Sequence, residues 1–287
     1  MGPDLEWCTG VELAEAVRSV LASSVAFIHL LPAQRPWLDG LLTRAGTMRV
    51  AMEWLAERLS RIPGVVVVTL GGSRAQGTHG PDSDWDFGLY YEHTIDPDDV
   101  RALGYEGTVV APGDWAYPMN GGAWLTIDGQ DVDLLYRDRA DVTRWTAEAN
   151  EGRWELFRMP GYLCGMASYV LVGEASVGRV LAGTLDQPGF PPRLGRDGPQ
   201  KWLWEARFWL QQAAAHADAG DIAACVGKCS AAIAAVAQAR LLERSEWALN
   251  EKGIVVRAGL AVVEALLLRR TDVMGLVEEV GGALELS

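Results

Sequence analysis

The sequence has no uninterrupted run of 18 apolar residues, no run of Lys and Arg, and an acidic rather than basic N-terminal segment. The first absence argues against a membrane span and the last against a secretory signal, so we predict a cytoplasmic protein with no membrane partner. Cysteines are few, at positions 8, 164, 225 and 229, and none forms a C-x-x-C pair. No cysteine-based metal site is therefore predicted. Internal repeats and low-complexity tracts are also lacking.

Acidic residues outnumber basic residues in the sequence. The 287 residues include 25 Lys and Arg against 38 Asp and Glu, a formal net charge of −13. Because affinity for a phosphate backbone comes largely from Lys and Arg, general nucleic-acid binding is not expected. The acidity would suit a cationic partner, and it equally suits a solvated, self-repelling surface. The apolar fraction of 49% is ordinary for a globular protein, and the length fits two domains.

The first half of the chain mixes helical and strand patterns. Helices are predicted over 11–31 and 47–60, strands over 65–70 and 85–91, and irregular chain over 96–122. Strands over 124–127 and 130–136 flank Asp128-Gly129, a two-residue turn that indicates a β-hairpin. Alternation along the second strand of this hairpin places Asp131 and Asp133 on the face opposite to Val132.

Strand signals fade after about residue 138. Helices are predicted over 138–150, 163–182, 200–218, 221–247, 254–268 and 271–279, with a Pro/Gly-rich linker at 187–200. One apolar stripe of helix 200–218 includes Trp202 and Trp209, and a second contains Trp204 and Phe208, which predicts burial between two layers. We therefore predict an N-terminal helical extension (1–47), an α/β domain with a mixed sheet (48–155) and an all-helical C-terminal domain (156–287).

The strongest chemical signal follows the strand at 65–70. The chain turns through Gly71-Gly72-Ser73 and enters the next strand through Asp84-x-Asp86. Glycines allow close backbone approach to a ligand and expose N–H groups that suit phosphate, and Ser73 adds a hydroxyl donor. Residues two apart on a strand face the same way, so the two carboxylates converge, and Asp133 could lie beside them. Three clustered carboxylates imply a cation such as Mg²⁺.

This Gly-Ser motif, ten residues before Asp84-x-Asp86, resembles the signature of the DNA polymerase beta-like nucleotidyltransferase superfamily. The branch it most resembles is the small antibiotic nucleotidyltransferases of aminoglycoside and lincosamide type. The resemblance is firm over about residues 48–137 and looser over the helical half. It implies that Gly72 and Ser73 hold the β- and γ-phosphates of a nucleoside triphosphate. It also implies that Asp84 and Asp86 bind two Mg²⁺ ions, with Asp133 binding one of them or acting as the base.

Other residues carry weaker signals. Arg74 follows the phosphate loop and is predicted to bind nucleotide, with simple solvation as the alternative. Lys228 stands alone among Ala, Cys and Ser; the resemblance implies that a helical-domain lysine reaches the triphosphate, and a surface lysine is the alternative. The polar break 249–253 either faces the cleft or caps a helix. Further candidates are His79 in the motif loop, Asp131 beside Asp133, and three tryptophans that could stack on a ring, Trp115, Trp124 and Trp154.

Three functions remain open from the sequence. The first is Mg²⁺-dependent transfer of a nucleoside monophosphate, AMP from ATP, to a hydroxyl of a small acceptor such as an antibiotic. The second is a regulatory or antitoxin-type interaction protein that keeps the nucleotide pocket. The third is a nucleotidyltransferase that modifies a protein or an RNA end, although the acidity argues against RNA. The oligomeric state, including a homodimer that completes the cleft, is not fixed by the sequence.

Overall fold

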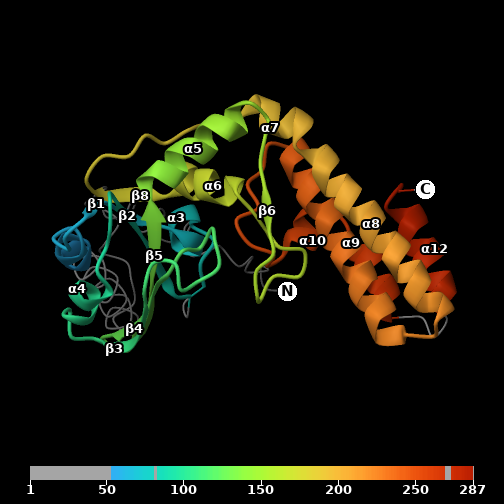
Figure 1. Cartoon of the computed structure of the whole chain (residues 1–287), viewed down its shortest axis with the longest axis horizontal. Helices are drawn as coiled ribbons and strands as arrows, with labels where there is room; N and C mark the ends of the chain where they lie inside the picture. Colours follow the sequence, from blue (N-terminus) through green and yellow to red (C-terminus); the bar gives the residue numbers. More distant parts are fainter. Residues whose placement is uncertain (1–52, 81–82, 269–272, 287) are drawn as a thin grey trace, which may run out of the picture.

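The structure, a computed structural model, describes residues 53–80, 83–268 and 273–286. The predicted extension 1–47 and its helix 11–31 lie outside the described residues. The predicted helix 47–60 is described from residue 53, and it is helical through residue 59. Figure 1 shows the sheet at the left, the long helices of the C-terminal half at the right, and α5 and α7 along the top between them.

Within the described residues, six strands form the main sheet. They are β1 (Val65–Leu70), β2 (Trp85–Tyr91), β3 (Glu106–Val110), β4 (Gly122–Ile127), β5 (Gln130–Asp138) and β8 (Arg179–Ala182). Their order across the sheet is β3-β4-β5-β2-β1-β8. Only the pairing of β2 with β5 is parallel among these strands, and the other four pairings are antiparallel. The predicted mixed sheet is therefore confirmed.

One face of this sheet forms a hydrophobic core with the helix at 53–59. Leu55 and Leu59 on the helix and Phe87 and Leu134 on the central strands are all buried within this cluster. The predicted hairpin is confirmed: Asp128 and Gly129 have φ values of 52° and 74°, the positive values that a two-residue hairpin turn requires.

The opposite face is covered only in part. Helix α5 (Arg139–Asn150) follows β5, and helix α6 (Tyr169–Val177) packs against α5. The buried guanidinium of Arg137 on β5 forms an ion pair with Glu174 of α6, and its Nη2 donates to Oε1 at 2.9 Å. This contact secures α6 over the C-terminal part of β5. The N-terminal parts of β2 and β5, which carry the acidic motif residues, lie further along the same face.

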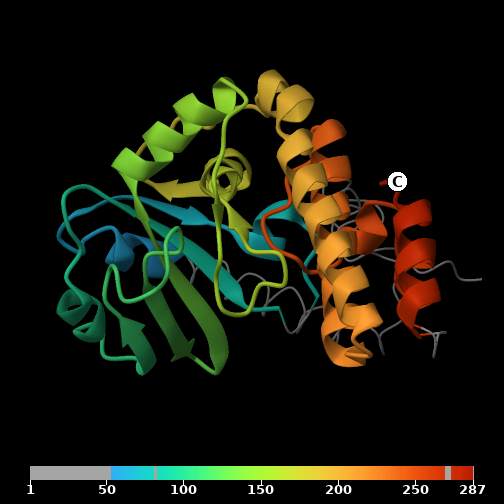
Figure 2. The ribbon, with the colours of Figure 1, turned by 45° about the vertical axis from the view of Figure 1, so that its right-hand side comes forward.

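The C-terminal half is helical, as predicted. Its elements are α7 (Pro192–Asp197), α8 (Pro199–Asp218), α9 (Ile222–Glu243), α10 (Ile254–Arg257), α11 (Ala261–Glu264), a 3₁₀ turn (Ala265–Leu268) and α12 (Val273–Ala283). Figures 1 and 2 show α8 and α9 side by side. Small buried residues on α9 allow this close approach, and Trp202 of α8 is completely buried. By length and composition α9 could cross a membrane, but 61% of its most apolar window is buried, as in a core helix.

Several expected elements differ from those observed. The region predicted to be irregular, 96–122, contains α4 (Pro97–Arg101) and β3, whose largely exposed residues show no alternation. The predicted helix 163–182 is instead β7 (Met166–Ala167, paired with β6, Leu156–Phe157), α6 and β8. Periodicity cannot distinguish a four-residue strand from a helical turn, so the sequence pattern could not predict the two short strands that flank α6. The predicted linker 187–200 contains α7, and 254–268 is broken into short turns.

The second apolar stripe of α8 is also not as predicted. Trp204 and Phe208 are 60% and 41% exposed, with rings stacked at a centroid distance of 5.7 Å, so this side of the helix faces solvent. In the first stripe, Trp202 is buried as expected and Trp209 is partly buried.

Candidate active site

The turn after β1 brings the backbone against the first strand of the acidic motif. The amide N–H of Gly71 donates to the carbonyl oxygen of Asp86 at 2.7 Å, and the short helix α3 (Gly72–Gln76) begins at the next residue. Gly72 has a φ of +58°, and a Cβ atom at this position would lie 1.7 Å from Oδ2 of Asp86. Glycine is therefore required at position 72 for two reasons: its backbone conformation, and the lack of space for a Cβ atom beside the carboxylate.

Strand register places the acidic residues in a row. Asp86 on β2 is the direct partner of Asp133 on β5, which is in turn the partner of Trp124 on β4. Partners in register share one face of a sheet, so these three side chains lie side by side. Asp84 precedes β2 by one residue. Carboxylate oxygens of Asp84, Asp86 and Asp133 all lie within 4.8 Å of one another, so the structure brings the three predicted carboxylates together.

Burial and neighbouring negative charges raise the pKa of Asp86 and Asp133. Burial, followed by the charges of Asp84, Asp133 and Glu174, raises the pKa of Asp86 from 3.8 to about 6. Burial and the charge of Asp84 raise the pKa of Asp133 to about 6 as well, opposed by a side-chain hydrogen bond with Trp124. These half-buried carboxylates repel one another and need a positive charge between them. They offer only hard oxygen ligands. This donor set fits Mg²⁺.

A cation from the helical half acts electrostatically on this cluster. The positive charge of Lys252 lowers the pKa of both Asp86 and Asp133, against the larger effects that raise it. Lys252 is exposed and lies in the segment between α9 and α10. The neighbouring Glu251 anchors this segment, because its carboxylate accepts hydrogen bonds from the backbone N–H groups of Leu163 (2.6 Å) and Cys164 (2.8 Å).

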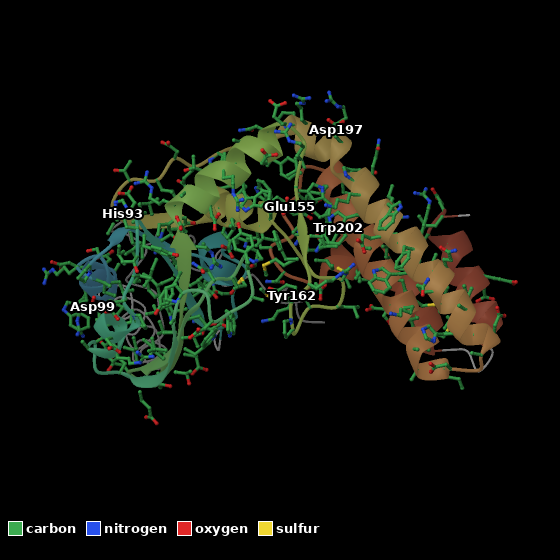
Figure 3. The ribbon with its side chains drawn as sticks, in the orientation of Figure 1. His93, Asp99, Glu155, Tyr162, Asp197 and Trp202 are labelled. Carbon is green, nitrogen blue, oxygen red and sulfur yellow. The ribbon has the colours of Figure 1, made fainter. Side chains whose placement is uncertain are left out.

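Lys252 belongs to a segment that the sequence left open between two interpretations. The polar break at 249–253 was visible, and its contact with the cleft was one of two interpretations. The electrostatic effect of Lys252 on two motif carboxylates supports the interpretation in which this segment faces the cleft. Tyr162, from the loop that Glu251 anchors, lies between the sheet and the helical half (Figure 3). Burial and the charges of Glu174 and Glu251 raise its pKa to about 12, so its hydroxyl stays protonated at neutral pH.

Arg74 braces the segment that leads into β2. Its Nε donates to the carbonyl oxygens of Asp84 (2.9 Å) and Ser83 (3.2 Å), and its guanidinium lies 4.0 Å from the centre of the Trp85 ring. Burial lowers the pKa of Arg74, and the charges of Asp84 and Asp86 oppose this. These contacts fix Asp84 through its backbone. Direct binding of nucleotide by Arg74 stays a prediction.

The remaining candidates are dispersed. The ammonium of Lys228 lies 4.4 Å from the centre of the Trp209 ring on α8, and its predicted contact with nucleotide stays a prediction. Trp154 is buried and stacked on Trp202, so it packs inside the helical half. His79 has a pKa lowered by burial and by Arg74. Asp131 is exposed on the face of Asp133 and raises its pKa.

Comparisons with known proteins agree with this site. Residues 52–143 match the family model of the nucleotidyltransferase domain, a range that contains α3 and all three clustered carboxylates. Residues 52–143 therefore form a nucleotidyltransferase domain, which supports the superfamily and the nucleotidyltransferase activity that the motif predicted. A search of curated proteins finds no significant match.

Two solved structures are similar to the chain at low identity. A nucleotidyltransferase-like protein from Exiguobacterium sibiricum is 13% identical, with a TM-score of 0.40, over 83% of this chain and 73% of that one. The CdnE cyclic dinucleotide synthase of Elizabethkingia meningoseptica, solved with GTP and Apcpp, is 11% identical, with a TM-score of 0.25, over 84% and 89%. These values are too low to transfer a substrate.

Proposed function

We propose that the protein transfers a nucleoside monophosphate, AMP from ATP, to a hydroxyl group of a small acceptor and releases pyrophosphate. An antibiotic of aminoglycoside or lincosamide type is the proposed acceptor class, and the cytoplasm is the proposed location. The observation that carries the reaction is the row of Asp84, Asp86 and Asp133 beside the glycine turn of α3. A net charge of −13 is compatible with a cationic acceptor.

Each element of the site has a part in this reaction. Gly72 and Ser73 hold the β- and γ-phosphates at the turn, and Arg74 keeps Asp84 in place. Asp84, Asp86 and Asp133 would hold two Mg²⁺ ions, which when bound neutralise phosphate charge and polarise the reacting oxygens. The acceptor oxygen bonds to the α-phosphorus while the bond to the β-phosphate oxygen breaks. We assign the hydroxyl proton to Asp133, with another carboxylate as the alternative base.

Ligand-dependent stability tests the nucleotide site. A ligand that binds only the folded state stabilises it by about 2.7 kcal/mol at 100 times its Kd. For a domain of this size, that corresponds to a rise in Tm of roughly 5–10 °C. We expect this rise for the wild type with both Mg²⁺ and ATP, and none for Asp84→Asn, as measured by differential scanning fluorimetry. A wild type that gains nothing with any triphosphate would contradict the proposal and favour the interaction protein.

Lys252 is expected to contribute to nucleotide binding. Loss of a charged contact costs about 1.5–3 kcal/mol, so Lys252→Met should raise the KM for ATP by roughly 10- to 100-fold. The measurement is initial rates of pyrophosphate release, with Lys228→Met assayed in parallel because both lysines compete for this role. A larger effect in Lys228→Met than in Lys252→Met would return the role to Lys228.

One observation supports the second candidate function. The stacked, exposed pair of Trp204 and Phe208 on α8 is an apolar surface of the kind used in protein contacts. This pair favours an additional partner, which can be a second copy of the chain in a homodimer, an antitoxin-type partner or a protein substrate. The intact acidic row argues for an enzyme in each case.

A further inference from the structure

The in-register row does not end at the carboxylates. Trp124 on β4 is the register partner of Asp133, so it continues the row on the same face of the sheet. Trp115, from the segment between β3 and β4, packs on Trp124 with a centroid distance of 4.4 Å and an interplanar angle of 43°. The side chain of Trp115 is 39% exposed, so part of its ring faces solvent. Together they form what we term the tryptophan pair.

The position of this pair follows from the strand order. Across the sheet, the turn of α3 at the end of β1 comes first, then Asp86 on β2, Asp133 on β5 and Trp124 on β4. The phosphate turn and the tryptophan pair therefore lie at opposite ends of the acidic row. In phosphoryl transfer the attacking and leaving oxygens are roughly in line through the phosphorus. If pyrophosphate leaves on the α3 side, the attacking hydroxyl approaches from the tryptophan side.

We propose that Trp115 and Trp124 bind the acceptor, and that this acceptor presents a saturated, hydroxyl-bearing ring such as a sugar or cyclitol. This assignment rests on the proposed nucleotidyl transfer. An indole face is electron-rich, so it attracts the polarised C–H groups that line one face of such a ring. The ring of Trp115 packs against Trp124, and its exposed part supplies the contact surface.

The tryptophan pair also lies beside the carboxylate that we assign as the base. Trp124 and Asp133, to which we assign the hydroxyl proton, are register partners on neighbouring strands, so a ring stacked on the pair has its hydroxyl groups next to Asp133. Asp131 is exposed on the same face, two residues before Asp133. It offers an acceptor for ring hydroxyl or amine donors that point away from the indoles.

Fluorine NMR of the full chain labelled with 5-fluorotryptophan tests this assignment. Trp115, Trp124 and Trp204 are identified by the loss of one resonance each in Trp115→Phe, Trp124→Phe and Trp204→Phe. The probes are kanamycin, lincomycin and methyl β-glucoside at millimolar concentration, added to protein with Mg²⁺ and a non-hydrolysable ATP analogue. We expect saturable shifts of the Trp115 and Trp124 resonances with at least one ring probe and no shift of Trp204, which lies on the exposed face of α8.

Each other outcome has a defined meaning. A shift of Trp115 caused by the nucleotide analogue alone would assign the pair to the donor base and overturn the proposal. Shifts of Trp204 as large as those of Trp115, or no shift with any ring probe while the analogue raises Tm, would also overturn it. No rise in Tm with the analogue would instead overturn the proposed function on which the assignment rests.

Kinetics supply a second test once an acceptor turns over. Trp115→Ala should raise the KM for that acceptor about tenfold, with little change in the KM for ATP. Trp115→Phe keeps an aromatic face and should retain most of the affinity, whereas Trp204→Ala is the matched exposed tryptophan. An effect of Trp115→Ala on the KM for ATP alone would contradict the assignment.

Discussion

Asp86→Asn should abolish nucleotidyl transfer and, without divalent metal, stabilise the folded protein. The activity is lost because the variant removes one of three convergent carboxylates of the acidic row. Stability rises because burial and neighbouring negative charges oppose ionisation of Asp86, whose pKa is raised from 3.8 to about 6. Asparagine keeps the shape of the side chain and removes the charge that the folded state disfavours.

The pH dependence of this gain has a definite sign. Between pH 3.8 and about 6 the folded state holds a proton on Asp86 that the unfolded state has released. The free energy of unfolding of the wild type therefore falls as pH rises through this window. The gain in the free energy of unfolding of Asp86→Asn over the wild type should be absent below this pH window. Above the window it should reach at most about 3 kcal/mol. Partial exposure of the site lowers the expected value.

Urea unfolding in EDTA, below and above the window, measures the gain, and pyrophosphate release measures activity. Asp128→Asn is the matched control, because Asp128 occupies an exposed hairpin turn with a φ of 52°, which asparagine also tolerates. The control should keep wild-type turnover. Retained turnover in Asp86→Asn would refute the metal assignment, and lower metal-free stability above the window would refute the electrostatic argument.

Gly72→Ala is expected to reduce turnover by at least about 100-fold with a modest loss of stability. The added Cβ would lie 1.7 Å from Oδ2 of Asp86, so the carboxylate must move. A displacement of about 1 Å at a reacting site can cost about 100-fold in rate. The alanine also adopts a left-handed conformation, which costs about 1–2 kcal/mol.

Gly77→Ala separates these two causes. Gly77 ends α3 with a φ of +71°, so alanine has the same backbone strain there, but its Cβ would meet nothing within 4 Å. Both variants should lose similar stability in thermal denaturation, and only Gly72→Ala should lose turnover. Equal losses of turnover would show that backbone strain, rather than contact with Asp86, explains the requirement for glycine.

Local patterns predicted much of this fold. The valine-rich run predicted β1. Asp128-Gly129 predicted the hairpin because a two-residue hairpin turn needs positive φ at both positions, and these two residue types tolerate it. Alternation on β5 then placed Asp133 on the correct face. The parallel pairing of β2 with β5 cannot be read from such patterns, because these strands are separated by β3, β4 and α4. The motif resemblance, rather than periodicity, brought Asp133 to the other two carboxylates.

Local sequence patterns could not predict contacts between residues that are far apart in the sequence or that depend on a loop conformation. Lys252 lies more than 100 positions after Asp133, and its relation to the cluster depends on how Glu251 anchors its segment to the loop at 163–164. Arg74 was visible as a charge beside the phosphate turn, but its contacts with the carbonyl oxygens of Ser83 and Asp84 depend on a loop conformation. The proposed division at 155–156 likewise stays a prediction.

The edge strand β8 has a consequence for any attempt to separate the two halves of the chain. It returns after α5 and α6 and pairs Val68, Thr69 and Leu70 of β1 with residues 179–182. A fragment ending at residue 155 would lack this strand and leave the outer edge of β1 unpaired. Open edges rich in valine are templates for intermolecular pairing. The catalytic half should therefore aggregate when expressed alone, and exchange of whole halves between relatives would need a junction beyond β8.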